Sequence, residues 1–163
     1  MTLRTIGRID IIDIPELDIE DIPAKVDTGA NRSAIHCSHI RKVKNGDKDE
    51  IEFTIPLDSS HGEHVIHTKS YFKKKIRSSS GHLEERYVIK ATILIFGRKI
   101  KTTFSLTDRA EMKYPVLLGR KLLRSRFVVD VAQENLSYKN KTSSKWTLLY
   151  YQEIQNYIQP ADS

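Results

Sequence analysis

The chain has 163 residues, 39% of them hydrophobic and 29% charged, with a formal net charge of +6. This composition is typical of a globular domain and excludes a disordered chain, and no apolar run reaches the roughly 18–20 residues that a transmembrane helix needs. Acidic residues interrupt the apolar stretch at 9–14, so we expect no secretory signal and no membrane partner. The single cysteine, Cys37, excludes an internal disulfide and favours a reducing, cytoplasmic location.

Alternation of apolar and polar residues predicts β-strands along most of the chain. The alternating stretches cover residues 22–26, 51–57, 87–95 and 100–106. Between the last two, Gly97-Arg98 is expected to form a two-residue type II′ hairpin turn, because glycine is favoured at its first position.

Shorter signals follow in the last third of the chain. Continuous apolar runs at 116–118 and 127–131 predict strands covered on both faces, and residues 120–126 predict the one short helix. A turn is predicted at 139–142, a strand at 146–150 and a helical turn at 154–158. Many short strands with one short helix favour an all-β barrel or sandwich. We expect a single domain over residues 1–163, with its core at about 5–151 and a tail at 152–163.

The most informative stretch is Asp27-Thr28-Gly29-Ala30, which ends the first alternating strand. A carboxylate at the end of a buried strand needs hydrogen bonds. The Thr28 hydroxyl is one candidate donor, and Gly29 lets a backbone amide approach the carboxylate closely. The alternative is an ordinary Asx turn with no catalytic role.

A second stretch, residues 115–123, takes an apolar strand into Gly119-Arg120 at the start of the predicted helix. Together with Asp-Thr-Gly-Ala about 90 residues earlier, it resembles the retropepsin-like aspartic peptidases. The match is closest to a bacterial and archaeal subfamily whose members are often labelled ATP-dependent zinc proteases. The matching stretches are 24–30 with Ser33, Ala34 and His36; 77–82 with 84–86; 106–109; and 114–120 with 129–130.

This resemblance implies a retropepsin-like closed β-barrel with one short helix after Gly-Arg. Some members of the subfamily act beside an ATP-grasp ligase that adds glutamates to a ribosomal small-subunit protein, and they remove or trim the added tail. The resemblance therefore implies an acidic peptide or protein substrate, with a ribosomal protein as one candidate. 

Aspartic-protease chemistry needs two carboxylates that share one proton and hold a water molecule between them. This chain offers one Asp-Thr-Gly. We therefore predict a homodimer in which Asp27 of each subunit, supported by Thr28 and Gly29, contributes half of the dyad on a twofold axis.

Residues 73–86 are predicted to form a hairpin with a polar, serine-rich tip and basic strands. By the resemblance, this hairpin is the flap that closes over the substrate, and its charge suits an acidic peptide. The alternative is a surface hairpin with solvated charges. The substrate-binding residues that we expect are Ala30, Arg77, Ser78, Ser79, Ser80, Gly81, His82, Arg86 and Arg120.

One position departs from the retroviral relatives, where an acidic residue after Asp-Thr-Gly-Ala pairs with the arginine of Gly-Arg. Here that position is Asn31. Arg120 must therefore pair with Asp130 or Asp108, or remain available to an anionic substrate.

The histidines give little support for a metal site. His36 and His39 point to opposite sides of a predicted strand, and in His61-x-x-His64-x-x-His67 the middle residue faces away from the other two. No zinc-protease helix motif and no phosphate-binding loop are present, so we expect neither metal nor other cofactor.

Two alternatives to a peptidase remain. The first is a retropepsin-like domain that binds an acidic or ribosomal partner without cutting it. The second is a basic nucleic-acid-binding β domain, which the pI of about 9.4 favours. Few aromatic residues are interleaved with the basic run at Lys73–Arg77, so a nucleic-acid partner is the weaker of the two.

Overall fold

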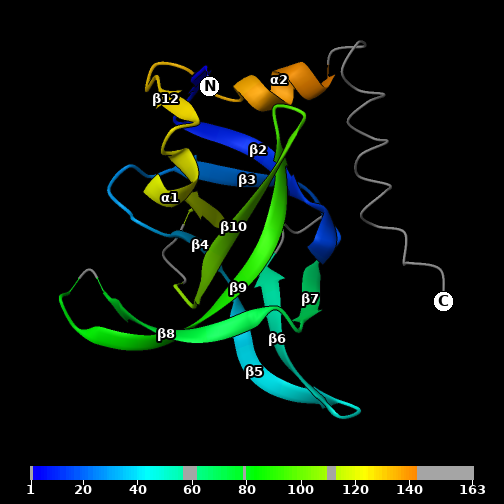
Figure 1. The fold of residues 1–163 in the computed structure, drawn as a ribbon. Coiled ribbons are helices and arrows are strands. Elements are labelled where there is room, and N and C mark those ends of the chain that lie inside the picture. Colours follow the sequence, from blue (N-terminus) through cyan, green and yellow to red (C-terminus); the bar gives the residue numbers. More distant parts are fainter. Residues whose placement is uncertain (1, 57–61, 79, 110–112, 143–163) are drawn as a thin grey trace.

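The computed structural model describes residues 2–56, 62–78, 80–109 and 113–142 (Figure 1). The elements, in chain order, are β1 (Arg4–Ile6), β2 (Ile9–Ile14), the 3-10 helix η1 (Pro15–Leu17), β3 (Ile19–Val26), β4 (Ser33–His36), β5 (Ser38–Asn45), β6 (Lys48–Pro56), β7 (Glu63–Thr68), β8 (Tyr71–Arg77), β9 (Leu83–Ile95), β10 (Arg98–Thr107), β11 (Val116–Leu118), α1 (Arg120–Leu123), β12 (Phe127–Val129) and α2 (Leu136–Thr142). The expected all-β class is confirmed.

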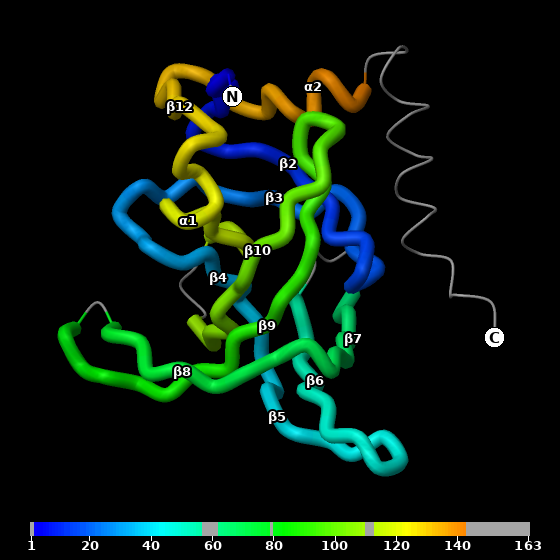
Figure 2. The backbone as a smooth tube through the Cα atoms, viewed as in Figure 1, coloured from blue at the N-terminus to red at the C-terminus, as the bar shows by residue number. Residues whose placement is uncertain are grey.

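The strands form three sheets. The largest has the order β10-β4-β11-β3-β2-β9-β8, and β10 also pairs with β9. A second sheet has the order β5-β6-β7, and β1 pairs with β12 in parallel. The β8–β9 hairpin extends away from the body of the molecule, as does the β5–β6 hairpin (Figure 2). 

The core lies on the strand faces that the alternation predicts. Ile51, Phe53 and Ile55 of β6 are fully buried. The register pairs Ile93 with Ile100 and Ile89 with Phe104, so β9 and β10 present one continuous apolar face. Opposite residues of an antiparallel pair share a face, which is why this alternation was readable from sequence.

The hairpin between β9 and β10 turns one residue earlier than predicted. Ile95 pairs with Arg98, so the loop is Phe96-Gly97. Both residues have positive φ, 53° and 68°, as in a type I′ turn rather than type II′. The Phe96 ring is buried 5.9 Å from that of Phe127, centroid to centroid, and the Phe96 N–H donates to Ser137 Oγ at 2.8 Å. These tertiary contacts fix the turn.

The helices also differ from the prediction. Helix α1 ends at Leu123, shorter than the predicted 120–126, and α2 occupies the region predicted as a turn at 139–142. The Asp10 carboxylate accepts the backbone N–H groups of Ser137 and Tyr138 at 3.0 and 3.1 Å, which caps the start of α2. The predicted strand at 146–150 and helical turn at 154–158 lie outside the described residues.

No helix among the described residues is long and apolar enough to cross a membrane.

Candidate active site

Strand β3 delivers Asp27 to a tight turn. The Asp27 N–H donates to the Leu118 carbonyl at 2.9 Å, and the Gly29 N–H donates to Asp27 Oδ1 at 2.9 Å. A Cβ on Gly29 would lie 3.2 Å from the same Oδ1. The predicted close approach of the Gly29 amide to the carboxylate is confirmed, and it orients Asp27, which is half-buried.

The segment from β11 into α1 holds this turn from behind. β11 runs parallel to β3, with Leu118 opposite Val26. The Arg120 N–H donates to the Ala30 carbonyl at 2.8 Å, and the Gly119 N–H donates to Ser33 Oγ at 3.0 Å. The Asp-Thr-Gly-Ala and Gly-Arg stretches, far apart in the sequence, are therefore hydrogen-bonded to each other.

Arg120 binds none of the partners named from sequence. Its Nη1 donates to the Thr28 carbonyl at 3.0 Å, while Asp130 Oδ1 accepts the Ala132 N–H. Arg120 therefore braces the Asp27 turn and does not line the cleft described next. Thr28 contributes this backbone carbonyl; its hydroxyl forms no hydrogen bond to Asp27 within the described residues.

A cleft of about 500 Å³ lies between the Asp27 turn and the β8–β9 hairpin. Asp27 is the only carboxylate among the described residues that line it. Six lining residues are basic: Arg32, Lys74, Lys75, Arg77, Arg86 and Arg109. The remaining lining residues are Gly29, Ala30, Asn31, Ala34, Ile76, Ser105, Thr107 and Leu117.

The predicted hairpin at 73–86 forms, with Arg77 opposite Leu83. The tip is closed on itself: the Gly81 N–H donates to the Ser78 carbonyl at 2.9 Å, and Arg77 Nη1 donates to the Gly81 carbonyl at 2.8 Å. The Gly81 amide, which was expected to reach substrate, is thus already bonded.

The basic strands of the hairpin line the cleft, whereas the described tip residues do not. The tip residues in question are Ser78, Ser80, Gly81 and His82, and the hydroxyls of Ser78 and Ser80 lie 2.8 Å apart. Ser79 lies outside the described residues. The roles expected for the tip stay predictions.

The three lysines of the run at residues 73–75 differ in their surroundings. Lys73 pairs with Glu85 at 3.3 Å, and this pair lies outside the cleft lining. Lys74 and Lys75 line the cleft. Only part of the run therefore serves the cleft.

Like charges crowd the mouth of the cleft. The positive charge of Arg32 is the main reason why the pKa of the exposed Lys121 on α1 is lowered, and the charge of Lys74 acts in the same direction. Burial lowers the pKa of Arg32 itself. An anion bound among these cations would relieve their mutual repulsion.

Arg32 and Arg109 were not predicted as site residues. Strand β4 pairs in parallel with β10, placing Ala34 beside Ser105 and His36 beside Thr107. This non-local pairing brings the segments around Arg32 and Arg109 to the cleft. The only sequence signal was that both segments belong to stretches that resemble the peptidase subfamily.

The described histidines are engaged separately. His36 Nδ1 accepts the Arg109 N–H at 3.1 Å, and His64 Nε2 lies 3.2 Å from the Leu17 carbonyl. His67 Nε2 lies 3.0 Å from Glu52 Oε2. Within the described residues no group of three or more His, Cys, Asp or Glu side chains is placed to hold a metal ion; His61 lies outside them. Burial raises the pKa of the Cys37 thiol to about 12, which disfavours a thiolate ligand.

Comparison with known proteins identifies one family model and several relatives that are similar to this chain. A family model described as RimB-like, "Retropepsin-like aspartic endopeptidase RimB", matches residues 5–140. A protein named "Probable alpha-L-glutamate ligase" from Shewanella halifaxensis is 32% identical over 130 residues, and one of the same name from Desulfotalea psychrophila is 30% identical over 131. The matches cover 78% and 79% of this chain but 28% of each relative, so the chain spans well under half their length.

The fold is also that of a solved structure. A crystal structure of a Legionella pneumophila protein of unknown function matches with a TM-score of 0.69 at 23% identity. The match covers 83% of this chain and 99% of the Legionella protein. 

Proposed function

The chain belongs to the RimB-like family of retropepsin-like aspartic endopeptidases, and from that premise we propose that it is an aspartic peptidase with Asp27 as its catalytic carboxylate. The observation that carries the proposal is the cleft in which Asp27, oriented by the Gly29 amide, is the lone carboxylate among six basic residues.

The lone carboxylate makes the proposed enzyme a homodimer. In the reaction, one carboxylate accepts a proton from the attacking water while the other, protonated, polarises the scissile carbonyl. The described lining of one chain supplies only Asp27, so the second carboxylate comes from Asp27 of a partner across a twofold axis. We also propose that the main sheet closes as a barrel, which the pairing of β10 with both β4 and β9 supports.

An acidic peptide is the substrate that this cleft favours. Carboxylate side chains next to the scissile bond would meet the cations of the hairpin, together with Arg32, which precedes β4, and Arg109, which follows β10. The relatives named as glutamate ligases contain a stretch similar to this chain. We propose that a glutamate tail on a protein, such as a ribosomal protein, is the substrate. 

The test offers synthetic peptides with glutamate tails, and uncharged peptides of equal length, and reads the products by mass spectrometry. Wild type is expected to cut the acidic peptides. The cleavage rate of Asp27→Asn should be lower by about 10²–10⁴-fold or more, because the substitution removes the group that takes the proton from water. A chelator should leave the cleavage rate of wild type unchanged. Cleavage that survives Asp27→Asn and stops with the chelator would show that the aspartic assignment is wrong.

A domain that binds glutamate tails without cutting them is the second candidate, favoured by the cations of the cleft and by the ligase names of the relatives. It predicts tight binding of the acidic peptides by wild type and Asp27→Asn alike, with no product from either.

A further inference from the structure

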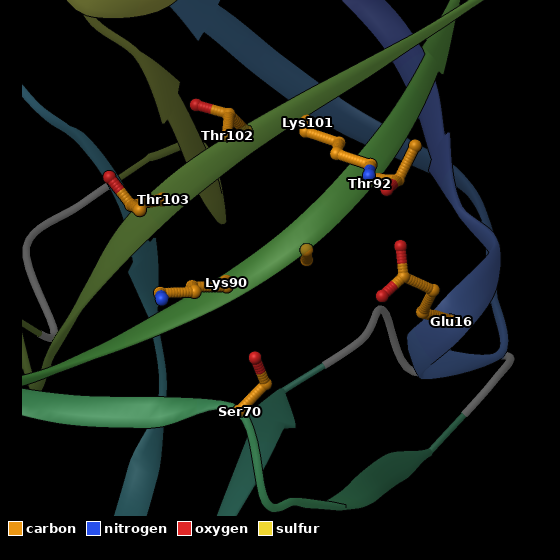
Figure 3. Close-up of a pocket in the computed structure, with 8 residues that line it drawn as sticks. Glu16, Ser70, Lys90, Thr92, Lys101, Thr102 and Thr103 are labelled. Carbon is orange, nitrogen blue, oxygen red and sulfur yellow. The ribbon is translucent and has the colours of Figure 1, made fainter.

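A second hollow, of about 480 Å³, lies on the outer face of β9 and β10 (Figure 3). Lys90 of β9 stands opposite Thr103 of β10, and Thr92 stands opposite Lys101. Opposite residues of an antiparallel pair share a face, so these four side chains line the same side of the two strands. Figure 3 shows Ser70, just before β8, and Glu16 of η1 completing the rim.

The lining chemistry suits carboxylates. Two ammonium groups and the hydroxyls of Ser70, Thr92 and Thr103 supply hydrogen-bond donors. Within the described part of the chain, neither Lys90 nor Lys101 forms an ion pair. The one acid of the lining, Glu16, is exposed on the rim.

This hollow is joined to the Asp27 cleft by Arg32. Arg32 lines the cleft, and its Nη1 donates to Thr103 Oγ1, in the lining of the hollow, at 2.8 Å. Arg32 and Lys90 also lie over the same ring, Phe72 of β8, at 5.9 and 6.0 Å from its centroid. Cations therefore follow one another from the cleft to the outer face of the sheet without an intervening acid among these contacts.

We propose that the hollow lined by Lys90 and Lys101 is an anion-binding exosite, which holds carboxylates of an acidic peptide beyond the part seated in the Asp27 cleft. An acidic peptide fits better than RNA, because none of the eight lining residues is aromatic and base stacking needs such rings. The link to cleavage rests on the proposed function; the binding itself does not.

The test measures binding to the Asp27→Asn protein, so that no peptide is consumed. Fluorescent peptides of about twelve and about four glutamates are compared, since about twelve residues span roughly 40 Å when extended and about four span roughly 14 Å. The variants, each in this background, are Lys90→Gln with Lys101→Gln, Glu16→Gln, and the control Lys44→Gln on the exposed part of β5.

The double lysine variant is expected to bind the long peptide about tenfold more weakly, as two charged contacts are lost, and the short peptide as before. Glu16→Gln should bind the long peptide more tightly by about twofold, because it removes a repulsive charge. Lys44→Gln should match its parent for both peptides.

Three results would overturn the exosite: unchanged long-peptide binding in the double variant, equal loss for both lengths, or a loss confined to a single-stranded RNA probe of similar length. The peptidase proposal is tested separately. If wild type cuts no peptide but the double lysine variant binds only the long peptide more weakly, the peptidase proposal is wrong and the exosite is supported. If wild type cuts the peptides but the double variant binds the long peptide as its parent does, the exosite is wrong and the peptidase proposal is supported.

Discussion

Asp27 and Arg120 show which contacts of the site can be predicted from single residues and which cannot. The turn at Asp27 follows local rules, since an amide bonded to the carboxylate two residues before it is a short-range pattern, and it was predicted from four residues. The partner of Arg120 was not predicted, because sequence suggests acids as partners for a guanidinium, whereas the Thr28 carbonyl is brought to it by the fold.

Gly119 should tolerate no side chain. A Cβ there would lie 2.7 Å from the backbone carbon of Arg32 and 3.0 Å from the Ala30 carbonyl oxygen. Backbone atoms cannot move aside as a flexible side chain can, so Gly119→Ala is expected to destabilise the fold by about 1–3 kcal/mol. Urea unfolding of variant and wild type measures this, and equal midpoints and slopes would contradict it. 

At the scale of elements, α2 was missed because its support is distant in sequence. Hydropathy patterns report neighbours within a few residues, whereas α2 is held by Asp10 and Asp13 of β2, both buried. The β8–β9 hairpin was predictable because both strands and the polar tip are adjacent in sequence. Which of its lysines face the cleft depends on how it folds over the Asp27 turn.

Helix α2 docks through Lys141, whose Nζ lies 3.1 Å from Asp13 Oδ2 and 2.7 Å from Asp21 Oδ1. Lys141→Met leaves Asp13 buried without its cation, so we expect a loss of about 3 kcal/mol at neutral pH. Urea unfolding measures the loss. The double variant with Asp13→Asn should recover part of it, since the uncompensated charge is gone.

The pH dependence of stability provides the control for the Lys141→Met experiment. Burial raises the pKa of Asp13 above its ordinary 3.8 even beside Lys141. A carboxyl with a raised folded-state pKa stabilises the fold below its ordinary pKa and loses that contribution as pH rises through the raised value. In Lys141→Met the pKa of Asp13 should be raised further, because the neighbouring cation is gone. The difference in free energy of unfolding between wild type and Lys141→Met should therefore become smaller as the pH falls toward about 4. A gap that widens in acid contradicts this.

Lys73 and Lys74 of the hairpin provide a matched pair of variants. Lys74 lines the cleft, whereas Lys73 pairs with Glu85 outside it. Lys74→Gln is expected to weaken binding of an acidic peptide several-fold, and Lys73→Gln is expected to change it little, because an exposed ion pair contributes at most about 1 kcal/mol. Fluorescence anisotropy at low and high salt measures both. Equal losses would show that the charge of the run acts only as a diffuse field.

At the scale of the whole molecule, the site combines segments that are far apart in the sequence within the family match. Residues near 30, 75, 86, 105 and 117 meet in one cleft only because β4 pairs with both β10 and β11. Composition gave the net charge of +6 but not its location. In the fold, six basic side chains line the same cleft as the Asp27 carboxylate. They concentrate the positive potential where an acidic substrate would be cut.

The homodimer is tested by mixing subunits, because the dyad needs Asp27 from both. Wild type and Asp27→Asn, carrying different tags, are unfolded and refolded together in equal amounts at constant total concentration. If each site uses both carboxylates, only wild-type pairs are active and about one quarter of the wild-type activity remains; if each chain acts alone, about half remains. Refolding wild type with itself is the control for recovery. Isolating the doubly tagged dimer and finding it inactive would complete the case, whereas an active mixed dimer would mean that one Asp27 is sufficient and that the second carboxylate lies elsewhere.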